Sequence, residues 1–111
     1  DTFPYTGGAS TATALYMGVP VVSLRGETHH ASRLGAAMLT AAGKSAWIAE
    51  DARTYENLAV RMAEDIAVVR ASRTALRAEV EKSALMDGAV YLSAATGEIE
   101  RVWAQRGDFA R

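Results

Sequence analysis

The residues best suited to carry chemistry are two glycines and two hydroxyl residues at the start of a predicted helix. Gly7 and Gly8 end a loop, and Ser10 and Thr11 follow at the front of an apolar segment. Backbone N–H groups in the first turn of a helix have no partner within the helix, and the helix dipole makes that end positive. We therefore predict a cradle for an anion such as a diphosphate, built from the amides of Gly8, Ala9 and Ser10. The glycines let a ligand approach the backbone, and the hydroxyls of Ser10 and Thr11 add donors.

A second interpretation of this turn stays open. Thr6, Ser10 and Thr11 are residue types that cap helix starts, so the turn could serve only to begin the helix. The turn matches neither GxxxxGK[ST] nor GxGxxG, so neither a P-loop nor a dinucleotide fingerprint is present. The choice between cradle and cap depends on whether protein atoms occupy the first-turn amides.

Thr13 is a further candidate, because helical spacing places it on the same side as Ala9 and Ser10, one turn on. Its hydroxyl could hold a ribose diol, although a carboxylate would be a stronger and more selective partner. The alternative is a threonine whose hydroxyl bonds back to its own helix turn.

His29, His30 and Arg33 form a possible cleft loop. A histidine there could donate to a phosphate or act as a base, and the alternative is a solvated loop histidine. Arg33 could pair with Glu27 or bind an anion in the cleft, and we expect a structural ion pair. We predict no metal site, because adjacent histidines point apart and no carboxylate stands at ligand spacing.

The elements that must position these residues are predicted to form an α/β fold, a short parallel sheet with helices on both faces. The first residues are expected to be the end of a strand. The carboxyl ends of parallel strands share one edge, which brings the 25–30 loop beside the 3–8 loop. Gly18 and Gly43 are expected to end the two helices. The expected elements are helix 9–17, strand 19–24, helix 31–42 and strand 45–49.

The second half of the chain predicts three helices packed across the face and edge of the sheet. Ser72 is expected to cap the middle one, which carries Leu76 and Val80. We divide the chain into an α/β cradle part (1–50), C-terminal helices (51–106) and a fraying tail (107–111). The first helix presents one face with Tyr55, Leu58, Met62, Ile66 and Val69, and the last (89–105) turns Tyr91, Ala95, Ile99, Val102 and Trp103 inward.

Composition narrows the function classes. The 111 residues allow one domain, and 12 basic against 13 acidic residues argue against binding nucleic acid or a membrane surface. The absence of cysteine excludes disulfides, cysteine zinc sites and thiol nucleophiles. No apolar run is long enough to span a membrane. We expect a cytoplasmic protein, and because Asp1 is not methionine we expect a piece of a longer polypeptide.

The run DTFPYTGGASTATALYMGVPVV, followed by a G-x-x-x-x-ASR-x-GA run, resembles the C-terminal catalytic region of the O-linked N-acetylglucosamine transferase family. The resemblance implies the last part of a Rossmann-like lobe of GT-B type. It implies UDP-N-acetylglucosamine as donor, no metal, and transfer to Ser or Thr of an acceptor protein. It also implies that an upstream part of the same polypeptide completes the catalytic region, with tetratricopeptide repeats before it.

Carried over by position, Gly8, Ala9 and Ser10 fall where the family contacts the diphosphate. Ala9 replaces a threonine, Thr13 replaces the aspartate that faces the ribose, and the histidine pair lengthens the 26–33 loop. The family's catalytic histidine and lysine precede Asp1, so no catalytic residue is predicted in this chain. A non-catalytic nucleotide-sugar-binding or interaction module is the alternative function.

Overall fold

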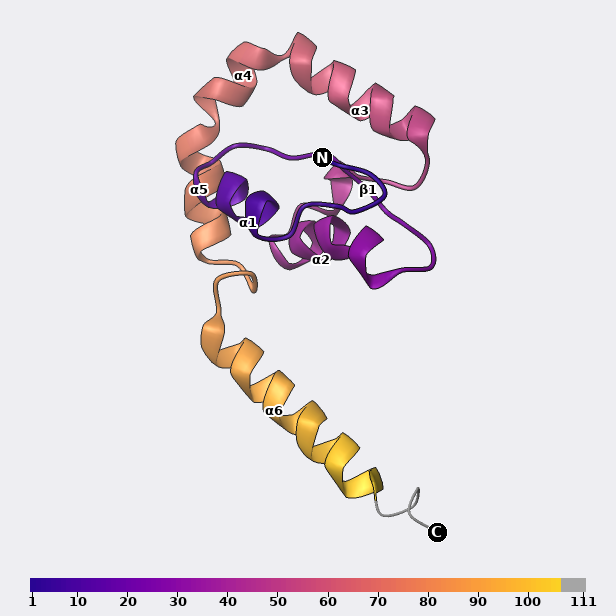
Figure 1. Cartoon of the computed structure of the whole chain (residues 1–111). Helices are drawn as coiled ribbons and strands as arrows, with labels where there is room; N and C mark the ends of the chain where they lie inside the picture. Colours follow the sequence, from indigo (N-terminus) through magenta and orange to yellow (C-terminus); the bar gives the residue numbers. More distant parts are fainter. Residues whose placement is uncertain (107–111) are drawn as a thin grey trace.

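A computed structural model describes residues 1–106 and shows an α/β core from which helices extend (Figure 1). The predicted tail, 107–111, lies outside the described residues. The elements in order are α1 (Ala9–Tyr16), β1 (Ser23–Leu24), the 3-10 turn η1 (His30–Ser32), α2 (Leu34–Ala41), the 3-10 turn η2 (Ser45–Trp47), β2 (Ile48–Ala49), α3 (Ala52–Glu64), α4 (Ile66–Ala71), α5 (Arg73–Glu81) and α6 (Gly88–Gln105).

The sheet of the described chain consists of β1 and β2, which are parallel as predicted, with Ser23 opposite Ile48. Both strands are shorter than expected. Val19 still donates to Ala14 at the end of α1, and the η2 turn occupies the first residues of the expected second strand. The strand end expected at the first residues is not formed, since residues 1–8 are neither helix nor strand.

Two glycines end α1 and α2 in the left-handed conformation that glycine favours. Gly18 has φ +71° and Gly43 has φ +70°, which confirms their predicted role. The first helix begins at the predicted residue, but the start of α2 differs. The helix expected from Ala31 begins at Leu34, because residues 30–32 form the tighter η1 turn.

The hydrophobic core lies between α1, α2, β2 and α5. Leu76 and Val80 of α5 are buried, and α5 packs along α1. Burial of this apolar surface supplies the main stabilisation of the α/β part. The buried cluster consists of Leu15, Ala36, Leu39, Ala42, Ile48, Leu76 and Val80.

The second half of the described chain contains four helices, not three. Asp65 interrupts the expected first helix, so α3 and α4 form an arch with α5 (Figure 1). The predicted apolar face is therefore split: Leu58, Met62 and Val69 border a pocket of about 540 Å³ under the arch, and Ile66 is exposed.

The predicted burial of α6 is wrong within the described chain. Tyr91 is 73% exposed and Trp103 is 68% exposed, and α6 contains no buried residue. Figure 1 shows α6 projecting away from the α/β core. Its side chains consequently add nothing to the core of residues 1–106.

Candidate functional site

The start of α1 carries a row of backbone donors that have no partner among the described residues, 1–106. Gly8 is the N-cap residue, and no side chain caps the helix. The first amide bonded in α1 is that of Ala12, which donates to the Gly8 carbonyl at 3.0 Å. Within residues 1–106, the amides of Gly8 and of positions 9–11 make no hydrogen bond to protein. Thr6, Ser10 and Thr11 therefore do not cap α1 through their side chains, and these donors stand at the positive end of the helix.

A small pocket opens beside these donors. Its volume is about 210 Å³, and its lining includes Gly7, Ser10 and Thr11. Thr11 is only 3% exposed, and its hydroxyl makes no hydrogen bond within the part of the chain that the structure describes. A hydroxyl with spare capacity next to unpaired amides can bind the oxygens of an anion. The remaining lining residues are Asp1, Thr2 and Val21.

The two glycines of the turn have different roles. A Cβ on Gly7 would lie 2.6 Å from Thr11 Oγ1 and 2.8 Å from Ser10 Oγ, so a larger residue there would force both hydroxyls to move. A Cβ on Gly8 would meet only the Leu34 side chain, at 3.7 Å. Gly8 therefore leaves the space in front of the amides open.

The amide of Gly7 is occupied by a residue that the sequence did not point to. Asp1 Oδ1 accepts from the Gly7 N–H at 2.7 Å and from the Thr2 N–H at 2.8 Å. Asp1 Oδ2 accepts from the Ser23 hydroxyl at 2.5 Å. Gly7 thus contributes space to the site rather than a donor. The only sequence signal for Asp1 was an acidic residue at the front of the loop.

The Thr13 hydroxyl donates to the Ala9 carbonyl at 2.8 Å. This is the back-bonded alternative, which holds the hydroxyl proton within the helix. The oxygen of this exposed side chain can still accept a hydrogen bond, for example from a sugar hydroxyl.

Thr6 joins the 3–8 loop to the segment that directly follows the predicted 25–30 loop. Its N–H and its hydroxyl both donate to the Ala31 carbonyl, at 3.1 and 3.0 Å, and its oxygen accepts from the Gly35 N–H at 3.0 Å. Thr6 is fully buried. It therefore satisfies the first turn of α2 rather than that of α1, which is a correction to its expected capping role.

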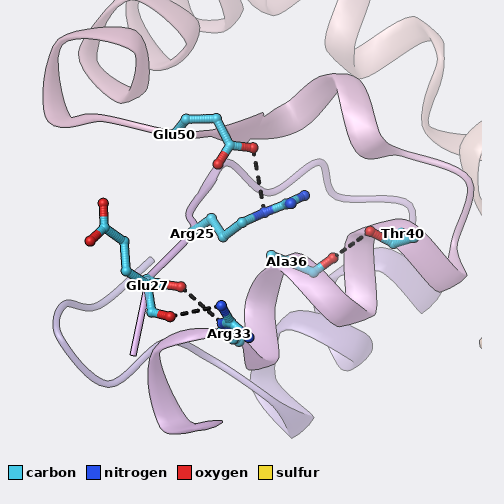
Figure 2. Close-up of polar contacts among 7 residues, drawn as sticks. Arg25, Glu27, Arg33, Ala36, Thr40 and Glu50 are labelled. Carbon is cyan, nitrogen blue, oxygen red and sulfur yellow. Dashed lines mark hydrogen bonds and ion pairs between the residues drawn. The ribbon is translucent and has the colours of Figure 1, made fainter. Parts of the chain in front are cut away.

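The cleft-loop residues are near the cradle in the chain's fold but do not line its pocket. His29 and His30 are exposed, and neither borders the 210 Å³ pocket. Arg33 donates to the backbone carbonyls of Gly26 (3.2 Å) and Glu27 (2.7 Å), and the Glu27 carboxylate points away from it (Figure 2). The expected ion pair of Arg33 is therefore wrong, and Arg33 instead braces its own loop.

Two further findings concern the described range as a whole. Among residues 1–106, no group of three His, Cys, Asp or Glu side chains is gathered as metal ligands would be. Over the same residues, none of the helices has the length and apolar character needed to cross a membrane.

The family model and several similar proteins all point to the same family of glycosyltransferases. Residues 1–95 match the model of glycosyl transferase family 41. A relative from Eustoma exaltatum subsp. russellianum, named probable UDP-N-acetylglucosamine--peptide N-acetylglucosaminyltransferase SPINDLY, is 38% identical over 92 residues, 83% of this chain. Proteins with the same name from Oryza sativa subsp. japonica and Solanum lycopersicum are 34% and 36% identical over 103 residues, 93% of this chain.

The matched region is a small part of those relatives. The chain spans only 10% to 11% of their length. The resemblance to the O-linked N-acetylglucosamine transferases is nevertheless confirmed, since the family model covers most of the chain and the identities exceed 30%. The chain belongs to glycosyl transferase family 41.

Proposed function

We propose that this chain is part of a UDP-N-acetylglucosamine-dependent glycosyltransferase that modifies Ser or Thr of an acceptor protein, and that the start of α1 binds the diphosphate. The observation that carries the proposal is the row of unpartnered amides at positions 8–11 beside the Thr11 hydroxyl. The names of the relatives supply the donor and the peptide acceptor.

The chemistry follows from where charge develops during transfer. In a direct displacement, the Ser or Thr hydroxyl oxygen of the acceptor bonds to the sugar carbon while the bond from that carbon to the diphosphate breaks. The hydroxyl proton would pass to a base in the upstream part of the polypeptide, and UDP leaves with the negative charge. Amides fixed at the positive end of α1 would stabilise that charge without a metal ion. The catalytic groups would come from the upstream part of the polypeptide, which would complete a GT-B region and present the acceptor through helical repeats. Residues 1–50 would form the cradle part and residues 51–106 the supporting helices.

The test uses the full-length protein and a charge placed at the cradle. Ser10→Glu puts a carboxylate in the first turn of α1, where the helix dipole favours it, so the fold should persist. The same carboxylate repels a diphosphate, and we expect UDP to bind at least about tenfold more weakly by calorimetric titration. Ser93→Glu, on an exposed residue of α6, is the matched control and should leave UDP binding unchanged.

Sugar transfer is measured with labelled UDP-N-acetylglucosamine and a protein acceptor. Transfer that falls in Ser10→Glu and persists in Ser93→Glu would support the proposal. A folded full-length protein that neither binds UDP at millimolar concentration nor transfers the sugar would reject it.

A second candidate is nucleotide-sugar binding without transfer. It is favoured by Thr13, whose hydroxyl proton is held by the Ala9 carbonyl and cannot be donated to a ribose. Binding of UDP without turnover by the full-length protein would support this second function over the first.

A further inference from the structure

The Asp1 carboxylate joins three parts of the cradle. Oδ1 accepts from the backbone N–H groups of Thr2 and Gly7, and Oδ2 accepts from the hydroxyl of Ser23 in β1. These bonds tie the front of the loop, the glycine turn and the strand to a single side chain. Bonds to an ionised acceptor are the stronger kind of hydrogen bond in proteins.

The surroundings of this carboxylate are shaped to receive it. A Cβ on Gly35, in the first turn of α2, would lie 2.9 Å from Asp1 Oδ2 and 2.2 Å from Ser23 Oγ. A Cβ on Gly7 would lie 3.3 Å from Asp1 Oδ1. Glycine at these two positions therefore gives the carboxylate its place between the turn, β1 and α2.

We infer that Asp1 is a positioning residue for the anion cradle. By holding the Gly7 N–H, it fixes the peptide that directly precedes the open donors of α1. The inference rests on the proposed function for its ligand, the diphosphate of UDP. The carboxylate also borders the same pocket, where its charge opposes an anion. If Asp1 mainly positions the turn, removing its carboxylate should weaken binding of the diphosphate. If it mainly repels the anion, removing the carboxylate should strengthen that binding.

The experiment compares two substitutions of Asp1 in the full-length protein. Asp1→Ala removes the acceptor, and we expect UDP to bind about tenfold more weakly, with a higher KM for the sugar donor. Asp1→Asn keeps an acceptor for the Gly7 N–H without the charge, so it should restore most of the lost affinity. Asp51→Ala is the matched control, because Asp51 accepts from the Thr54 N–H at the start of α3 in the same way, and it should not change UDP binding.

Each outcome decides the inference. Unchanged or tighter UDP binding by Asp1→Ala would overturn it, because repulsion would then dominate or the bond would have no effect. Equal weakening by Asp1→Ala and Asp1→Asn would also overturn it, because charge rather than placement would be responsible. If Asp1→Ala does not fold, Ser23→Ala releases the other carboxylate oxygen and should weaken UDP binding in the same direction, by a smaller factor, and no weakening would count against the inference.

Hydrogen exchange separates failure of this inference from failure of the proposed function. It is measured without nucleotide on the amide of Gly7, which donates to Asp1. Faster exchange in Asp1→Ala than in Asp1→Asn or Asp51→Ala supports the positioning role even if the wild-type protein binds no UDP. Identical exchange in all three variants would overturn it.

Discussion

Thr6 shows how one buried side chain can hold two loops together. Its oxygen accepts from the Gly35 N–H while its hydroxyl donates to the Ala31 carbonyl. The sequence indicated a capping threonine but not which helix it serves, since Gly35 lies 29 positions further along the chain. Asp1 was missed in part for the same reason, because its partner in β1 is 22 positions away, although its other two partners are close in sequence. The start of α1 at Ala9 was predictable, since it depends only on neighbouring residues, and a helix start leaves its first amides unpaired.

Thr6→Val keeps the shape of this side chain and removes the two hydrogen bonds of its hydroxyl, to the Ala31 carbonyl and from the Gly35 N–H. We expect a loss of about 1 to 3 kcal/mol in the free energy of unfolding, because the buried Gly35 N–H is left without a partner. Thr40→Val is the control: its hydroxyl donates to the Ala36 carbonyl in its own helix, on an exposed residue (Figure 2). Urea unfolding of both variants checks the prediction, and equal losses would contradict it.

At the scale of elements, helix ends were more predictable than strands. A glycine in the left-handed conformation is a local signal, and Gly18 and Gly43 both act as expected. The lengths of β1 and β2 depend on which strands pair with them, and that information does not lie within either segment. The break at Asp65 was also missed, because the apolar spacing continues across it while the chain turns there.

The two helix-ending glycines form a matched pair for substitution. Alanine at Gly43 meets open space and should cost about 1 kcal/mol, from the left-handed backbone alone. Alanine at Gly18 would place a Cβ 2.2 Å from the Arg73 carbonyl, so α1 and α5 must separate. We expect the Gly18→Ala loss in unfolding free energy to exceed the Gly43→Ala loss by about 1 kcal/mol or more. Equal losses in urea unfolding would show that the α1–α5 contact is not tight.

Asp51, at the N-cap of α3, should make the stability of the chain depend on pH. The pKa of Asp51 lies below its usual value of 3.8, because the carboxylate accepts a hydrogen bond from the Thr54 backbone N–H and another from the Thr54 hydroxyl. A carboxyl group with a lowered pKa in the folded state stabilises above its unfolded pKa, and this contribution is lost as the pH falls through its folded pKa. Below about pH 3.8, the wild-type chain should therefore lose stability more steeply than Asp51→Asn. Parallel urea-unfolding curves against pH would contradict the assignment.

At the scale of the whole molecule, the buried apolar residues that stabilise the described chain lie in the α/β core and α5, and none lies in α6. The radius of gyration is 16.9 Å, compared with about 13 Å for a compact chain of 100 residues, because α6 extends from the core. The amphipathic pattern of α6 was recognised from the sequence. The prediction that α6 is buried was wrong for residues 1–106. An apolar stripe shows that a helix face is suited to packing, but it does not identify the surface against which that face packs.

This division predicts unequal costs for two apolar substitutions. Leu39 is fully buried in the core, and Leu39→Ala should cost about 2 to 5 kcal/mol in unfolding free energy. Ile99 is 68% exposed on α6, and Ile99→Lys should change it by less than about 0.5 kcal/mol. Urea unfolding of the chain measures both. A large loss for Ile99→Lys would mean that α6 packs on the core after all.

The Ala31 carbonyl has a mechanical consequence. It receives both the N–H and the hydroxyl of Thr6, so two segments 25 positions apart are joined at one oxygen atom. Separating the two segments requires the Thr6 N–H bond and the Thr6 hydroxyl bond to the Ala31 carbonyl to break together. The segment with Thr6 and the glycine turn should therefore move together with the segment that contains the two histidines and Ala31.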